Sequence, residues 1–291
     1  MTTQTIALTR SLGRPNFLSG LRALGAVMKR EWMIFLRYPS WFISLFIWPI
    51  IFPLSYIMTA RALSGRDGIG MAQFQATTGL HDYTGYIAIG TTIWMWQNVV
   101  LWNIGFSLRN EQLRGTLESN WLSPTWRFAY LLGSSAPQLL SMLMFLTVSA
   151  VEFVLVFGVQ FQGSLWLTLL VLLAAIPSVY GLGFAFASLV ITAKEANAFV
   201  FLVRGLVMIF CGITYPISIL PDWMRPIANW LPQTYIIHAI RSASLSTDGL
   251  PAITGDLKIL ALFGIFWLTF GYLVFNWMER RARRTGAIGQ Y

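Results

Sequence analysis

The segment RNEQLRGTLESNWLSP, from Arg109 to Pro124, is the only strongly polar stretch deep inside an otherwise apolar sequence. The apolar runs on either side of it, 83–108 and 128–161, are each long enough to cross a bilayer. Read as a helix, the segment has one apolar stripe formed by Leu113, Leu117 and Trp121. Its wetter side carries Glu111, Arg114 and Glu118, and the last two can pair across one turn. The pattern predicts a short amphipathic helix on the membrane surface, ended by Pro124 and suited to docking a soluble partner.

Composition indicates an integral membrane protein. Hydrophobic residues make up 56% of the chain and charged residues only 11%, whereas charged residues are about a quarter of soluble proteins. The formal charge of +9 does not indicate nucleic-acid binding, because the basic residues cluster at the ends of apolar runs. The single cysteine, Cys211, cannot form an internal disulfide. No cleavable signal peptide is expected, so the first span would serve as the insertion signal.

Six apolar runs are predicted to cross the membrane, which makes the expected fold an all-α integral membrane protein. The runs are 41–60, 83–108, a crossing within 128–161, 165–192, 199–214 and 259–278. An amphipathic pattern from Leu18 to Arg37 predicts an additional helix lying in the anionic inner leaflet. Residues 61–82 are expected to form an external loop. We therefore expect a single membrane domain over 1–291, with an arm at 1–40, the spans at 41–278 and a basic tail at 279–291.

The basic residues predict the orientation of these spans. Six spans place both termini on one side, and the segments on that side carry 14 of the 20 Lys and Arg residues. The segments on the opposite side carry 5. Since basic residues concentrate on the cytoplasmic side, both termini and the polar segment at 109–124 are expected in the cytoplasm.

The region from 215 to 256 does not have the pattern of a span. Four prolines cut it into apolar pieces too short to cross, which fits re-entrant or interfacial helices packed against protein. The block around it reads Phe210-Cys-Gly-Ile-Thr-Tyr-Pro-Ile-Ser-Ile-Leu-Pro-Asp-Trp223, then Leu231-Pro-Gln-Thr-Tyr235 and Ala239-Ile-Arg241.

Two of these features together resemble the type-2 ATP-binding-cassette (ABC) exporter permeases. Glu111, the run Gly115-Thr-Leu-Glu118 and Ser123-Pro124 are similar to the cytoplasmic coupling helix of that family. The 210–241 block is similar to the broken hairpin that the family places on the outer side between its last two spans. The resemblance implies that the contact with the ATPase involves Glu111, Gly115, Thr116 and Glu118. It also implies that the 210–241 block gates the outer exit, with Tyr215, Pro216, Pro221 and Pro232 as candidate gate residues.

The resemblance implies partners as well. Two copies of the chain, or one copy and a related permease chain, would form a pathway at their interface in the cell (plasma or inner) membrane. Two cytoplasmic ABC ATPase subunits would drive it, with ATP and Mg bound on the ATPase and no cofactor on this chain. The Gly-Thr-Leu-Glu form is more similar to the drug and small-lipophile branch of the family than to the polysaccharide branch.

The chain itself has no motif for ATP hydrolysis. A phosphate-binding loop ends in Gly-Lys-Ser/Thr, and the three lysines, Lys29, Lys194 and Lys258, are followed by Arg, Glu and Ile. Any ATPase must therefore be a separate chain, and this chain is expected to be a transport subunit and not an enzyme.

Two charges are expected at membrane depth, where an unpaired charge costs on the order of 3 kcal/mol at the centre. Glu152 should lie nearer the outer surface and Arg204 nearer the inner one, so a direct pair between them is not expected. Either residue can line the export path, clamp the spans together or snorkel toward its own interface. We expect Glu152 to face the interior of a dimer. His81 and His238 lack the ligand spacing of a metal site and are predicted to be surface loop residues.

Three alternatives remain open from sequence. Polysaccharide or lipid-linked glycan export is the nearest one. A secondary transporter or channel would need coupling acids or a selectivity ring near the midplane, for which Glu152 alone is thin support. A membrane-embedded transferase would need a catalytic constellation, and none is apparent in the sequence.

Overall fold

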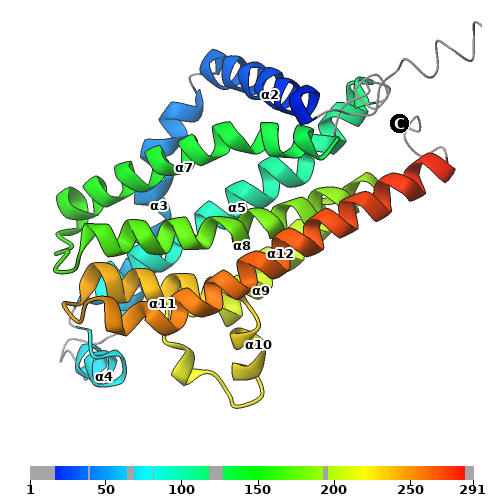
Figure 1. Ribbon diagram of the computed structural model, residues 1–291. Helices are drawn as coiled ribbons and strands as arrows, with labels where there is room; N and C mark the ends of the chain where they lie inside the picture. Colours follow the sequence, from blue (N-terminus) through cyan, green and yellow to red (C-terminus); the bar gives the residue numbers. More distant parts are fainter. Residues whose placement is uncertain are drawn as a thin grey trace, which may run out of the picture.

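The computed structural model describes residues 17–38, 40–63, 69–80, 82–117, 127–192 and 196–285, and all regular structure in these ranges is helical (Figure 1). The prediction of an all-α membrane fold is confirmed. The helices are α2 (Phe17–Arg37), α3 (Ser40–Leu63), α4 (Ile69–Thr78), α5 (Tyr83–Leu113), α7 (Phe128–Phe157), α8 (Leu165–Thr192), α9 (Ala196–Phe210), the short 3₁₀ turn η1 (Ile217–Ile219), α10 (Arg225–Asn229), α11 (Pro232–Leu245) and α12 (Leu250–Thr285).

Within the described ranges, four helices are long and apolar enough to span a membrane. They cover Ile43–Ala62, Phe128–Phe157, Leu165–Leu189 and Leu250–Arg281. The two other predicted spans correspond to α5, which has 31 residues, and to α9, which has 15. At 1.5 Å per residue α9 extends only about 22 Å, so it cannot cross a hydrocarbon core of about 30 Å by itself.

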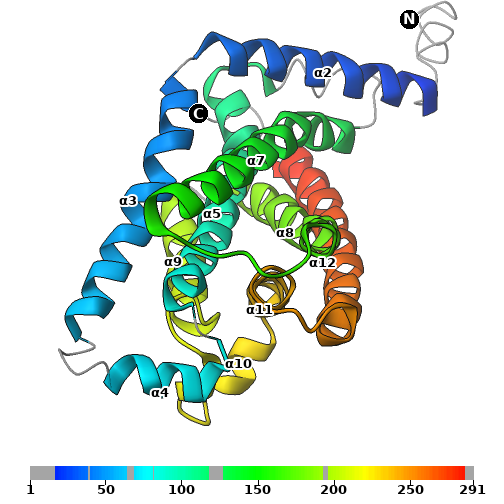
Figure 2. The same cartoon turned by 90° about the vertical axis from the view of Figure 1, so that its left-hand side faces the viewer.

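Helix α5 forms the centre of the molecule. Every residue from Gly85 to Asn98 is buried, because α5 packs against α3, α7, α8, α9 and α11 (Figure 2). Its buried residues include Thr91, Thr92 and Gln97, which face protein where the outer helices face lipid. A central helix surrounded by protein can therefore be less apolar than the helices around it.

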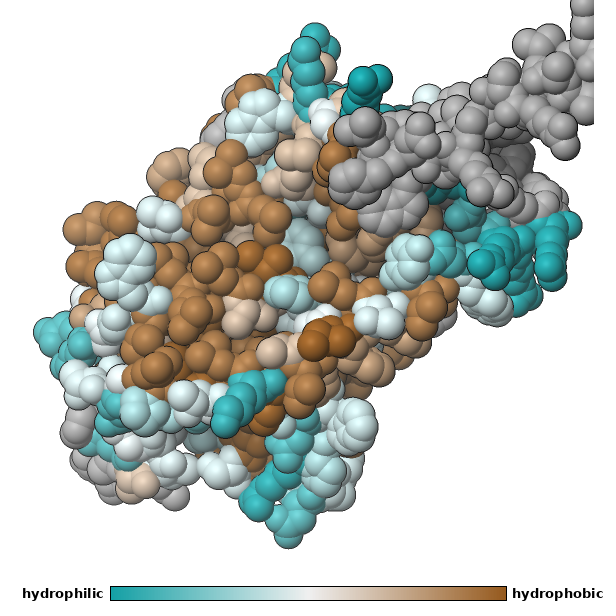
Figure 3. All heavy atoms as spheres, in the orientation of Figure 1, coloured by the Kyte–Doolittle hydropathy of each residue, from teal (hydrophilic) through white to brown (hydrophobic). Residues whose placement is uncertain are grey.

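The outer helices expose apolar side chains. Figure 3 shows an apolar surface across the middle of one face, with hydrophilic side chains gathered near α2 and at the C-terminal end of α12. The most exposed of these apolar residues include Leu155, Leu165, Trp166, Leu262 and Ile265. Such a surface suits contact with lipid.

Small residues allow α8 and α12 to pack closely side by side (Figure 1). A Cβ atom at Gly181 would lie 2.5 Å from the backbone of Trp267 and Leu268. A Cβ at Gly271 would lie 2.7 Å from the carbonyl oxygen of Gly181. Close backbone approach through glycine is a usual form of helix packing in membranes.

Three boundaries differ from the sequence prediction. The region at 61–82, predicted as an external loop, contains the helix α4, whose Phe74 packs edge-on against Tyr83 and Tyr86. The last span begins at Leu250 and not at Ile259, because the chain turns at Gly249, which has a φ of +72°, and then continues as one helix of 36 residues. The fifth span ends at Phe210 and not near Thr214, since Gly212 has a φ of +66° that a helix does not allow.

Candidate functional site: an inner charge cluster and an outer clasp

The prediction of a separate surface helix over the polar segment is wrong for the first half of the segment. Residues Arg109 to Leu113 form the last turn of α5, which ends there through a glycine cap. The amide of Gly115 donates to the Gln112 carbonyl oxygen and that of Thr116 to the Glu111 carbonyl oxygen, each at 3.0 Å. Gly115 has a φ of +70°, which favours glycine. The glycine of the Gly-Thr-Leu-Glu run therefore ends a span and turns the chain, instead of lying within a helix.

Glu111 lies at the centre of a charge cluster at this turn: Arg30, Glu31, Glu111, Thr116 and Tyr130. We call it the inner cluster, and we use inner and outer for the two sides that the distribution of basic residues predicts. Only 3% of the Glu111 side chain is exposed. The Arg30 guanidinium lies 3.1 Å from Glu111 Oε1, and the Thr116 hydroxyl donates to Glu111 Oε2 at 2.6 Å. Arg30 also donates to the Tyr130 hydroxyl at 2.8 Å and pairs with Glu31. The cluster thus joins the arm helix α2, the inner end of α5 and the start of α7.

Glu111 lies beyond the uncharged part of α5, and its carboxyl stays ionised at neutral pH. Burial by itself would raise the pKa of this carboxyl. The hydrogen bond from Thr116 and the positive charge of Arg30 outweigh burial, so the pKa lies below its ordinary value. A buried carboxylate that is fixed in this way can hold the arm and the turn in one arrangement.

The arm is also held by close packing on α7. In Figure 2, α2 lies across the end of the bundle where α7 begins. A Cβ atom at Gly133 would lie 2.8 Å from Cβ of Val27, so the two helices meet at a glycine. The arm is therefore attached to both α7 and α5.

Of the predicted ATPase-contact residues, the structure brings Glu111, Gly115 and Thr116 together at one turn. Glu118, with Trp121, Ser123 and Pro124, lies outside the described residues. Sequence reasoning missed Arg30 and Tyr130 as members of the cluster. In the sequence, Arg30 was noted only as one of the basic residues of the arm. No sequence spacing relates it to Glu111, which lies about 80 positions further along the chain.

At the opposite end of α5, Arg241 on α11 forms a second buried structure, which we call the outer clasp. The residue is 6% exposed. Its guanidinium donates to the carbonyl oxygens of Tyr86 (2.8 and 3.1 Å), Gly212 (2.8 Å) and Ile213 (2.6 Å). The Tyr86 ring also lies against it, with the ring centre 3.3 Å from Cζ. Gly212 and Ile213 follow the C-terminal end of α9, where the helix dipole favours a cation. One side chain thus joins residues 211–232, from the end of α9 to the start of α11, to α5, and we call these residues the broken segment.

Glycine makes the outer clasp possible on the α5 side. A Cβ atom at Gly90 would lie 2.1 Å from the Ile213 carbonyl oxygen and 2.4 Å from an Arg241 nitrogen. Neither distance is sterically possible. The conformation of the broken segment therefore depends on Gly90 and Gly212 as well as on the prolines.

The four candidate gate residues lie along the broken segment. Pro216 precedes η1, Pro221 follows it, and Pro232 is the first residue of α11. The Tyr215 hydroxyl donates to the Ile209 carbonyl oxygen of α9. The outer turn between α7 and α8 closes over the other end of α11, with the amides of Gly163 and Ser164 donating to the carbonyls of Ser244 and Ala243.

The prediction that His238 is a loop residue is wrong. It lies on α11, and its Nδ1 is 2.7 Å from Asp256 Oδ2 on α12. Both Arg241 and His238 line an outer cavity of about 590 Å³ between α4, the break and α11. His81 lies outside the described residues. Within the described ranges no three His, Cys, Asp or Glu side chains are grouped to hold a metal ion.

We expect the contact between His238 and Asp256 to depend on pH. The hydrogen bond to Asp256 raises the pKa of His238, so its stabilising effect is complete below the ordinary histidine pKa and is lost as pH rises through the raised value. His238 is exposed, so the effect is small. Thermal unfolding of the purified chain between about pH 6 and about pH 9 should show a small alkaline loss of stability. Asp256→Asn should remove this loss, and an unchanged pH profile in that variant would contradict the assignment.

Glu152 and Arg204 form no ion pair with each other. Glu152 lies on α7 near its outer end, and its Oε2 is buried without a hydrogen-bond partner among the described residues. Arg204 lies near the middle of α9, and its guanidinium lies over the Trp94 ring.

Comparison with known proteins supplies the family. Curated proteins give no match to the chain. A sequence model described as ABC-2 family transporter protein matches residues 51–273, which includes α5, the inner turn, the broken outer segment and most of α12. Family members are permease components that associate with ABC ATPase subunits. With four apolar helices of spanning length and this match over most of its length, the chain is a multi-pass membrane protein that belongs to the ABC-2 transporter family.

Proposed function

We propose that the chain is the permease subunit of an ABC exporter that moves a hydrophobic or amphipathic molecule, drug-like or lipid, out of the cytoplasm or the inner leaflet. The inner cluster is the observation that carries this proposal. It fixes the turn after α5 with a buried carboxylate, and a rigid turn at a membrane surface can transmit the motion of a docked ATPase to the spans.

The partners follow from the same proposal. Two cytoplasmic ATPases would bind ATP and Mg and contact the segment that starts at Glu111. A second copy of this chain or a related permease would complete the pathway, within the cell (plasma or inner) membrane and with both termini in the cytoplasm. The single-domain organisation over 1–291 is part of this proposal.

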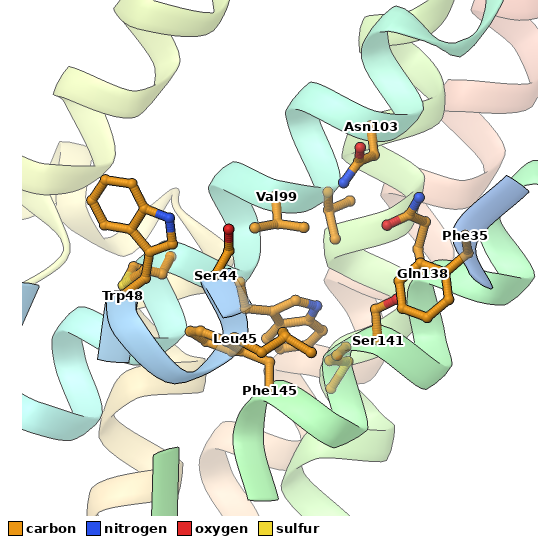
Figure 4. Close-up of a pocket in the computed structure, with 13 residues that line it drawn as sticks. Phe35, Ser44, Leu45, Trp48, Val99, Asn103, Gln138, Ser141 and Phe145 are labelled. Carbon is orange, nitrogen blue, oxygen red and sulfur yellow. The ribbon is translucent and has the colours of Figure 1, made fainter. Parts of the chain in front are cut away.

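A cavity among α2, α3, α5 and α7 supports the substrate class. Figure 4 shows its lining, in which apolar and aromatic side chains surround a few amide and hydroxyl groups. The polar lining residues are Ser44, Asn103, Gln138 and Ser141. The cavity has a volume of about 90 Å³, so it holds one apolar group of a substrate and not the whole molecule, and a mostly apolar wall suits such a group better than a sugar.

Purification from the native membrane tests the proposal. The tagged chain, extracted in a mild detergent, should bring an ABC ATPase with it. Inside-out vesicles that contain the complex should accumulate a lipophilic fluorescent dye with ATP and not with a non-hydrolysable analogue. Purification of the chain without an ATPase, or dye uptake that does not need ATP hydrolysis, would favour a channel or a secondary transporter.

A further inference from the structure

Arg204 has an unusual environment for a cation in a membrane-embedded helix. It is partly buried, yet no described residue accepts a hydrogen bond from its guanidinium and no described carboxylate lies within ion-pair distance. It is six residues from the outer end of α9, or about 9 Å along the helix. An unpaired charge in this setting is costly unless something outside the protomer meets it.

The contacts that Arg204 does make fix its position and leave its N–H groups without an acceptor among the described residues. Its Cζ lies 4.6 Å from the centre of the Trp94 ring, and the Trp94 indole N–H donates to the Arg204 carbonyl oxygen at 3.3 Å. Trp94 is 3% exposed, so the ring is a fixed platform. A guanidinium stacked on a ring keeps its N–H donors in its own plane, where they can bind a carboxylate, sulfonate or phosphate with two hydrogen bonds.

Aromatic rings continue from this platform toward the cavity of Figure 4. The ring centre of Phe52, on α3, lies 5.4 Å from that of Trp94, and the ring centre of Trp48 lies 5.6 Å from that of Phe52. Trp48 is itself part of the cavity wall (Figure 4). One continuous row, which we call the aromatic row, therefore connects an apolar cavity to an unpaired cation.

We propose that Arg204 and the aromatic row form a binding site for an amphipathic substrate with an anionic group at one end and a flat apolar body. The anionic group binds the edge of the Arg204 guanidinium, which the buried Trp94 ring holds in place, and the body lies along Phe52 and Trp48. This proposal rests on the proposed export function, because only a transported molecule would be a substrate. The binding test below needs no ATPase, so the binding site and the export function can be disproved independently.

Two fluorescent probes with the same ring skeleton test the site: anilinonaphthalene sulfonate, which is anionic, and phenylnaphthylamine, which is neutral. Energy transfer from tryptophan to each probe is titrated on the purified full chain in a non-ionic detergent, with empty micelles subtracted. Arg204→Gln should weaken saturable binding of the sulfonate by about tenfold and leave binding of the neutral probe unchanged. Lys258→Gln removes the same charge from an exposed site on α12 and should change neither probe.

Arg204→Lys keeps the charge without the planar fork and provides a second variant if the glutamine variant does not fold. It should weaken sulfonate binding by less than the glutamine variant and again spare the neutral probe. Unchanged sulfonate affinity in either variant, or equal weakening of both probes, would overturn the proposal. Phosphatidylglycerol added to the micelles should not displace the sulfonate, and displacement would assign the site to the headgroup of a bilayer lipid instead of a molecule with a flat apolar body.

Discussion

Glu111→Gln is expected to weaken the association of the chain with its ATPase by as much as about thirtyfold. The substitution removes the charge that Arg30 and the Thr116 hydroxyl hold, and hydrogen bonds to charged groups contribute about 1.5–3 kcal/mol each. A loss of about 2 kcal/mol in the ordered form of the turn corresponds to roughly thirtyfold in any binding that requires that form. The measurement is the amount of ATPase that co-purifies, together with the ATP hydrolysis rate of the complex.

Glu31→Gln is the matched control for this prediction. Glu31 pairs with the same Arg30 but does not contact the turn, and its side chain is 25% exposed. It should leave the ATPase bound. Equal loss of the ATPase in both variants would mean that the inner cluster acts only through the arm, whereas no loss in Glu111→Gln would mean that the turn is not the docking element.

Arg241→Gln is expected to lower the thermal stability of the chain more than Arg225→Gln, the corresponding change of the arginine within the broken segment. It leaves the buried carbonyl groups of Tyr86, Gly212 and Ile213 without their donors, and an unsatisfied buried group costs about 1–3 kcal/mol. A total loss of roughly 3 kcal/mol or more should lower the thermal unfolding midpoint of the purified chain by several degrees. Tryptophan fluorescence during heating in detergent measures that midpoint.

Arg225 provides the comparison for the outer clasp. It also donates to two carbonyl oxygens of the broken segment, those of Leu220 and Ser218, but it lies at the surface beside Asp222. Water can replace its hydrogen bonds, so Arg225→Gln should shift the midpoint little. Equal shifts in the two variants would show that burial of Arg241 does not matter for the outer segment.

Apolar run length predicted the main helices because a bilayer sets a minimum length for a span. The same reasoning failed where protein, and not lipid, surrounds the chain. Helix α5 is less apolar than α3, α7 and α8 and yet the most central, since its Thr and Gln side chains face other helices. Helix α4 was not predicted because no apolar period marks it, and its Phe74 is held by Tyr83 and Tyr86.

The sites could be predicted only in part. Glu111 was found through the resemblance of its segment to the coupling helix of the family, whereas the Gly-Thr-Leu-Glu run was predicted as part of a helix and its Gly115 instead turns the chain. Arg30 and Tyr130 could not be found, because the pairing is set by how α2 packs on α7. Arg241 was visible as a residue of a motif, but its ligands are backbone carbonyls, which any sequence would supply. Its role follows only from the close approach that Gly90 allows.

Site-specific cross-linking tests the central claim, that the inner turn after α5 docks a separate ATPase. Arg114, whose side chain is 61% exposed, is replaced by cysteine in a Cys211→Ala background, and native membranes are treated with a thiol-to-amine cross-linker. Asp222→Cys, at a side chain that is 96% exposed in the broken outer segment, is the control. A cross-link to an ABC ATPase from position 114 and none from position 222 is the predicted result. No ATPase adduct from position 114, or adducts from both positions, would contradict the account.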